Sequence, residues 1–394
     1  MARYPRIQEQ HIAVFGEGGS GKTVLASSFY GPAQEKSFSN GLWDLVADDT
    51  GLGNRLYSNY VGMRDHATVP ATTRFASTTY YFSVKLKRGG DAKAKKRPFD
   101  ILRLGWHDYP GEWFASSSLL GEEEANRRVE TFRSLLRSDV ALLLVDGQKL
   151  LDYKGEEERY LKSLLTNFRQ GLLRLKEDVL AGEGRLDEFP RIWIIALSKA
   201  DLFPDWDVHS FRDLVIWKAT EHIEHLRATL QDFVVTPEAL SMGDDFMLLS
   251  SAKFELSADG PEPVEIDVTK RVGVDLILPV ASLLPLEHLV QWQERIQIPM
   301  KVLDTLADDT LARVLIGGLS LGVSKVVARL PTVGPLASKA AIPALIAAVK
   351  MADSQLRQIN EQARESHDYV TATLTQFKLD LDQGETDGLL IRSK

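Results

Sequence analysis

The chain contains no cysteine, and this absence excludes both disulfide bonds and metal sites built from thiolates. It also lacks an apolar N-terminal run of the kind that a signal peptide needs. No run of about 18 uncharged apolar residues is present, so we predict no simple membrane-spanning helix. Together these absences indicate a protein of the cytoplasm.

The chain has no excess of positive charge, since 55 acidic residues outnumber 47 lysines and arginines and the net charge is -8. That balance gives no support to a general role in nucleic-acid binding, and we predict no specific nucleic-acid partner. A hydrophobic share of 44% and a charged share of 26% are typical of a folded globular protein. With 394 residues the chain has room for one large domain or two.

One short segment, Gly16–Thr23, is rich in glycine and fills every fixed position of the phosphate-loop pattern G-x-x-x-x-G-K-[S/T]. The segment follows an apolar run at 11–15 that predicts a buried strand, and a helix is predicted to begin at Lys22. Glycines let a backbone wrap phosphates, while loop amides and the helix N-terminus point at anionic oxygens. An ordinary glycine-rich turn is the disfavoured alternative. The residues expected to bind phosphate are Gly16, Gly18, Gly19, Ser20, Gly21, Lys22 and Thr23.

Apolar runs and amphipathic stretches alternate along the next part of the chain. Strands are predicted at 79–86, 99–106, 140–145, 192–197 and 246–249, and helices at 161–179, 211–233 and 287–306. Such alternation indicates an α/β sheet covered by helices on both faces. We expect 79–86 and 99–106 to form a hairpin with a basic tip, and 32–70 to be an irregular connection with one helix.

Three short polar motifs follow predicted strands. In Asp108-Tyr109-Pro110-Gly111 a carboxylate stands where Mg²⁺ is held in many nucleotide-binding proteins. In Ser198-Lys199-Ala200-Asp201 the carboxylate could accept paired N–H bonds from guanine, which adenine cannot offer on that edge. In Ser251-Ala252-Lys253 the Ala252 amide could donate to the guanine carbonyl. Each motif alone is usually only a polar turn, so their order along the chain is the stronger signal.

The ordered set of motifs resembles that of the translation-factor/Ras-like (TRAFAC) class of P-loop GTPases, in its bacterial type, over about residues 8–296. The resemblance implies a P-loop NTPase three-layer sandwich: a mostly parallel six-stranded sheet with helices on both faces. It also implies GTP/GDP and Mg²⁺ as ligands, and a molecular switch that hydrolyses GTP slowly without an activator. The activator would be an unidentified protein partner or a second copy of the chain.

The resemblance also assigns roles to individual residues. Ala71-Thr72-Thr73-Arg74 resembles a first switch loop, in which we favour Thr73 over Thr72; two ordinary loop threonines remain the alternative. Catalytic roles fall on Lys22, Thr73, Gly111 and Glu112, metal binding on Thr23, Thr73 and Asp108, and base binding on Ser198, Lys199, Asp201, Ser251, Ala252 and Lys253. Two positions depart from the family pattern. Ser198 stands where most members have asparagine, and Glu112 stands where Ras-like members have a glutamine that orients water.

The composition changes after the predicted GTPase domain of 8–296. We predict a C-terminal helical region at 297–381 and a loose tail at 382–394. Within the helical region, 310–352 contains no acidic residue and is rich in aliphatic ones. Such helices could lie against an anionic membrane as a peripheral contact at its inner face, or could pack on protein, and both readings stay open.

Two other functions also stay open at this stage. One is a nucleotide-dependent scaffold or membrane-associated binding protein with negligible turnover. Glu112 favours this function, because it replaces the glutamine that orients water in Ras-like members. The other is a P-loop ATPase, in which the motifs at 198–201 and 251–253 would be coincidences.

Overall fold

The computed structural model describes residues 6–35, 41–70, 77–87, 99–109, 111, 122–181, 184–186, 192–235, 237, 240–256, 263–295 and 353–393. Several predictions fall outside these residues. They concern Thr72, Thr73, Arg74, Glu112, the basic tip of the hairpin and the acid-free segment 310–352.

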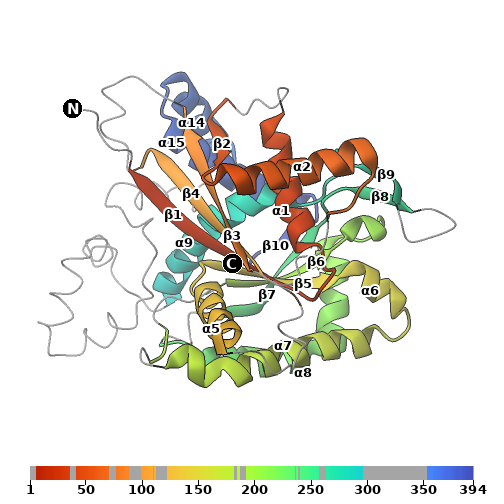
Figure 1. Cartoon of the computed structure of the whole chain (residues 1–394). Helices are drawn as coiled ribbons and strands as arrows, with labels where there is room; N and C mark the ends of the chain where they lie inside the picture. Colours follow the sequence, from red (N-terminus) through yellow and green to blue (C-terminus); the bar gives the residue numbers. More distant parts are fainter. Residues whose placement is uncertain are drawn as a thin grey trace, which may run out of the picture.

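An eight-stranded sheet forms the centre of the structure, in the order β10-β7-β6-β5-β1-β4-β3-β2 (Figure 1). Its strands are β1 Ile7–Phe15, β2 Trp43–Ala47, β3 Thr78–Leu86, β4 Ile101–Asp108, β5 Val140–Asp146, β6 Ile192–Ser198, β7 Ser241–Leu249 and β10 Leu390–Ile391. The neighbours from β7 to β4 pair in parallel, whereas β3, β2 and β10 pair antiparallel. The protein is therefore a mixed α/β structure with a large, mostly parallel sheet.

The sheet separates two apolar cores because successive side chains of a strand point to opposite faces. In β1, Ile12 and Val14 enter one core, and Ala13 and Phe15 enter the other. Helices cover both faces, as the alternating pattern predicted (Figure 1). The first core is closed by α1 Lys22–Tyr30, α2 Thr50–His66, α9 Ile277–Arg295 and α15 Tyr369–Thr386, and the second by α5 Glu122–Leu136, α7 Glu157–Leu180 and α8 Val208–Gln231.

The remaining elements are short or peripheral. They are α6 Gly147–Asp152, α14 Asp353–Glu365, the 3-10 helices η1 Gly31–Gln34, η2 Ala200–Leu202 and η4 Val274–Leu276, and a hairpin of β8 Lys253–Leu256 with β9 Pro263–Asp267. The β8–β9 hairpin and β2 were not predicted. In β2 only Leu45 is buried, so the strand carries almost no apolar pattern of its own and depends on pairing with β3.

All six predicted strands belong to the sheet, but the six-stranded expectation is wrong because β2 and β10 extend it at its two edges. The hairpin prediction is confirmed, since β3 and β4 pair antiparallel. In the part of the chain that is described, no helix is both long and apolar enough to cross a bilayer.

The loose tail predicted for 382–394 is also wrong. The helix α15 continues to Thr386, and Leu390 and Ile391 pair with β7. Arg392 is buried and its guanidinium contacts Glu287, Asp382 and Glu385 at 2.6–2.8 Å. The described part of the region predicted as separate, 353–381, packs on the same core as the sheet through α15.

Candidate functional site

The glycine-rich segment Gly16–Thr23 links the end of β1 to the first turn of α1. Gly19 and Gly21 have φ angles of 83° and 89°, a conformation that side chains other than glycine rarely adopt. No neighbouring atom lies within 4 Å of where a Cβ would stand on either residue, so conformation rather than space requires glycine there. The loop thus curls around an open volume at the N-terminus of α1.

Lys22 folds back across this loop. Its Nζ donates to the carbonyl oxygens of Gly16 and Glu17, at 2.8 and 3.0 Å, and lies 5.2 Å from the centre of the Tyr109 ring. The side chain is buried. A polyphosphate in the loop would offer the ammonium stronger, charged acceptors than these two carbonyls.

Thr23 and Asp108, both predicted as metal ligands, lie together. The Thr23 hydroxyl donates to Asp108 Oδ2 at 2.7 Å. Burial raises the pKa of the Asp108 carboxyl above its ordinary value, and the Thr23 hydrogen bond and the Lys22 ammonium oppose that shift. Asp108 Oδ1 is buried without a hydrogen-bond partner among the described residues. A hydroxyl beside a carboxylate with one orphaned oxygen fits a hard divalent cation such as Mg²⁺.

The segment that follows β4 braces the glycine-rich loop. The Tyr109 hydroxyl accepts a hydrogen bond from the Gly16 amide at 2.7 Å, and the Tyr109 side chain is fully buried. At Gly111 a Cβ would come within 2.2 Å of the Gly18 nitrogen and 2.4 Å of the Glu17 carbonyl carbon. The segment after β4 is therefore packed directly on the loop backbone.

For the nucleotide site predicted from the sequence, we expect Gly111→Ala to weaken nucleotide binding by at least about tenfold, because forcing a methyl group against rigid backbone costs on the order of 1–3 kcal/mol. The matched control is Gly62→Ala in α2, where a Cβ would make only ordinary contacts, the nearest at 3.7 Å. That control should keep full affinity. Equal affinities of Gly111→Ala and the parent in a titration would show that the loop does not need this close approach.

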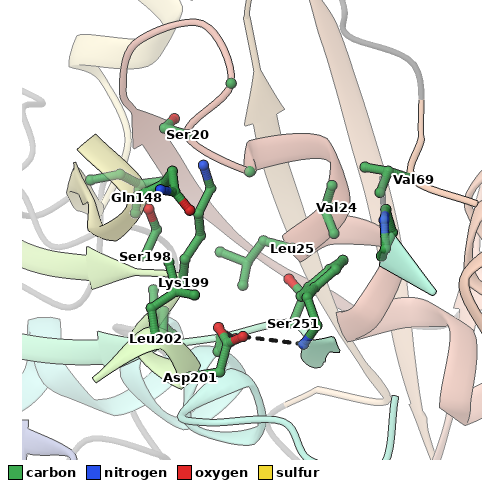
Figure 2. Close-up of a pocket in the computed structure, with 17 residues that line it drawn as sticks. Ser20, Val24, Leu25, Val69, Gln148, Ser198, Lys199, Asp201, Leu202 and Ser251 are labelled. Atoms are coloured by element: carbon green, nitrogen blue, oxygen red, sulfur yellow. Dashed lines mark hydrogen bonds between the residues drawn. The ribbon is translucent and has the colours of Figure 1, made fainter. Parts of the chain in front are cut away.

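One pocket of about 230 Å³ connects the loop with the motifs predicted to bind a base. Gly19, Ser20 and Gly21 line one end, and Lys199, Asp201 and Ser251 line the other. Figure 2 shows Ser20 and Asp201 at opposite ends, with Leu25 between them. Ser20 Oγ is buried and has no hydrogen-bond partner in the described parts of the chain. The pocket therefore offers polar groups at both ends and apolar walls between them.

Asp201 is held from two sides. The Ser250 hydroxyl donates to its Oδ1 at 2.5 Å, and the Phe254 amide donates to its Oδ2 at 3.3 Å. The second of these bonds is the dashed line in Figure 2. Both oxygens are thus fixed in place, and each keeps a second lone pair with which to accept from a ligand.

Lys199 and Ser198 complete this end of the pocket. Lys199 adopts a left-handed conformation, with φ of 56°, and its Nζ lies 2.8 Å from Oδ1 of the buried Asp146. This ion pair lays the aliphatic stem of Lys199 along the pocket. The Ser198 hydroxyl donates to the Val145 carbonyl at 3.2 Å. This hydrogen bond goes to β5 rather than to the glycine-rich loop.

Not every predicted base-binding residue lines the pocket. Ser198, Lys199, Asp201 and Ser251 do so, whereas Ala252 is fully buried and Lys253 points outward to Glu255 at 3.3 Å. Sequence reasoning missed Ser250 and Phe254, which flank the predicted motif. No local pattern distinguishes Ser250 from Ser251; only the fold shows that the Ser250 hydroxyl meets Asp201.

The chain was also compared with known proteins. No protein-family model matches its sequence, and a search of curated proteins finds no match either.

Proposed function

We propose that the chain is a Mg²⁺-dependent GTP-binding and GTP-hydrolysing switch of the TRAFAC class of P-loop proteins. The observation that carries the proposal is the single pocket lined by Gly19–Gly21 at one end and Asp201 at the other. Residues far apart in the sequence thereby meet in the order in which a nucleotide presents its phosphates and its base.

At the phosphate end, the loop amides and the N-terminus of α1 would bind the phosphate oxygens. Lys22 would exchange the carbonyls of Gly16 and Glu17 for the β- and γ-phosphates. Thr23 and Asp108 would hold Mg²⁺, which neutralises charge on the transferring phosphoryl group. Water attacks the γ-phosphorus and the bond to the β-phosphate oxygen breaks, giving GDP and phosphate.

At the other end, Asp201 would select guanine. The N1–H and N2–H groups of guanine are two donors on one edge, and they match the two oxygens of a carboxylate. Adenine presents an acceptor at N1, which would face the carboxylate unfavourably. Because Ser250 and Phe254 already orient Asp201, little ordering is needed when a base binds.

The switch itself would involve loops on either side of the γ-phosphate. Gly111 lies against the backbone of the glycine-rich loop, so a γ-phosphate bound in that loop would change the contacts of Gly111 directly. Thr73 and Glu112 are assigned by the resemblance alone. Slow turnover, an activating partner or self-association, and a peripheral membrane contact through 310–352 belong to the same proposal.

The test is to measure binding of labelled GDP, GTP and ATP with Mg²⁺, together with phosphate release. We expect guanine nucleotides to bind at least about 100-fold more tightly than ATP, from two hydrogen bonds to a charged group. Lys22→Ala should lower the single-turnover rate by about 10²–10³, as for loss of one donor to a transition state. Lys162→Ala, an exposed lysine of α7 that pairs with Glu158, is the control and should change neither quantity.

The alternatives give different results in the same assays. Tighter binding of ATP would favour a P-loop ATPase. Tight GTP binding without phosphate release, with or without anionic lipid, would favour a scaffold. No binding of guanosine nucleotides in the presence of Mg²⁺ would contradict the proposal.

A further inference from the structure

An ion pair joins the glycine-rich loop to the short helix α6. Glu17 Oε2 accepts a hydrogen bond from Lys149 Nζ at 2.8 Å, although the two residues are 132 positions apart in the chain. Both side chains are partly exposed, Glu17 at 28% and Lys149 at 37%. Glu17 occupies the first variable position of the phosphate-loop pattern, which specifies neither its charge nor a partner. Only the tertiary structure therefore brings these two charges together.

The helix α6 holds Lys149 in a defined place beside the pocket. Asp146, the last residue of β5, caps α6 by accepting from the Gln148 amide at 3.0 Å, and it also pairs with the Lys199 ammonium at 2.8 Å. Gln148 itself lines the pocket, as does Ser20 of the glycine-rich loop (Figure 2). Because α6 begins where a central strand ends, the position of Lys149 is set by the sheet rather than by a loop.

Glu17 places a negative charge on the loop that would receive phosphates. Its carbonyl oxygen accepts from Lys22 Nζ at 3.0 Å, so the residue lies at the phosphate end of the pocket. A carboxylate near phosphates repels them, and the repulsion is stronger at a partly buried site than in bulk water. The Lys149 ammonium, 2.8 Å from the carboxylate, cancels most of this repulsion. Since partly exposed ion pairs add little to folding stability, we expect this pair to act mainly on ligand binding.

We propose that Lys149 neutralises Glu17 and thereby determines how tightly the glycine-rich loop binds a polyphosphate. This inference rests on the proposed function, because it takes Gly16–Thr23 as the phosphate-binding loop. Lys149 does not line the pocket and acts through Glu17, so it is a positioning residue for charge. The effect acts on the phosphates and not on the purine. It should therefore be larger for a triphosphate than for a diphosphate.

The experiment measures binding of GDP, a non-hydrolysable GTP analogue and inorganic tripolyphosphate, each with Mg²⁺. For Lys149→Gln we expect GDP affinity to fall on the order of tenfold, and the affinity for the two triphosphates to fall further. Lys149→Arg keeps the charge and should keep parental affinity. The double variant Glu17→Gln/Lys149→Gln removes both charges and should return to within about threefold of the parent.

Salt provides a second readout that a purely structural role would not change. The loss caused by Lys149→Gln should be smaller at about 0.5 M salt than at about 0.05 M, because partly exposed charges are screened. The matched control is Lys176→Gln, which breaks another ion pair of 2.8 Å, with Asp232, at the distant end of α7. This control should leave all three affinities unchanged at both salt concentrations.

The outcomes separate this inference from the proposed function. Parental affinities in Lys149→Gln would overturn the inference. A double variant as weak as Lys149→Gln would also overturn it, because the pair would then hold the shape of the loop rather than its charge. A parent protein that binds tripolyphosphate but not GDP would overturn the proposed function alone, and the tripolyphosphate series would still test Lys149. A parent that binds none of the three ligands would overturn both.

Discussion

Asp201→Asn is expected to reverse the purine preference from guanine to xanthine. The asparagine oxygen can still accept from the Phe254 amide, and its NH₂ group can donate to Ser250 Oγ, because the Ser250 hydroxyl can turn to donate to the Ala252 carbonyl oxygen at 2.8 Å. The side chain then offers a donor where the carboxylate offered an acceptor. Guanine loses one hydrogen bond to a charged group and meets an opposed donor, while the extra carbonyl of xanthine gains a partner.

The size of this reversal follows from the energies of paired hydrogen bonds to a base. Each correct pair contributes about 1–3 kcal/mol of discrimination. Losing the preference for guanine and gaining one for xanthine should therefore change the ratio of GDP to XDP affinities by about 10²–10⁴. Competition of GDP and XDP for the purified variant measures this ratio directly.

A matched variant is available on the surface. Asp213→Asn makes the same chemical change at an exposed side chain of α8 that pairs with Arg212, and it should leave the ratio unchanged. If Asp201→Asn binds GDP and XDP in the parental ratio, the base does not lie against Asp201.

Arg392→Met is expected to destabilise the fold by about 3–5 kcal/mol, because it leaves buried carboxylates without their cation. The Arg392 side chain is only 3% exposed, and Glu287, one of its partners, is 7% exposed. Lys378 remains 3.2 Å from Glu287 and compensates in part. The affected contacts join the edge strand β10 to α9 and α15, two helices that cover one face of the sheet.

Urea denaturation at neutral pH measures this loss, with Arg212→Met as the control. Arg212 pairs with Asp213 at the surface, where an ion pair contributes about 0–1 kcal/mol, so the control should be nearly neutral. A loss below about 1 kcal/mol would mean that the tail does not anchor these helices.

The strands of the sheet centre could be predicted because their sequence pattern is local. β5 and β6 are buried along their whole length, and their sequences are almost continuous apolar runs. The pattern of Gly16–Thr23 likewise predicts a phosphate-binding loop from eight consecutive residues between a strand and a helix. The edge strands could not be predicted in this way. The Leu390–Ile391 pair is too short to carry a pattern, and its place is decided by β7 and by the buried ion pairs of Arg392.

The sequence by itself determined the glycine-rich loop, the order of the polar motifs and the alternation of strands with helices, because each depends on residues close together in the chain. Only the tertiary structure decided that Ser250 rather than Ser251 holds Asp201, that Lys253 turns away, and that Phe254 faces the pocket. These outcomes depend on the direction in which each side chain points where β7 ends and β8 begins. A shift of one position exchanges the two faces, and packing between distant segments sets that register.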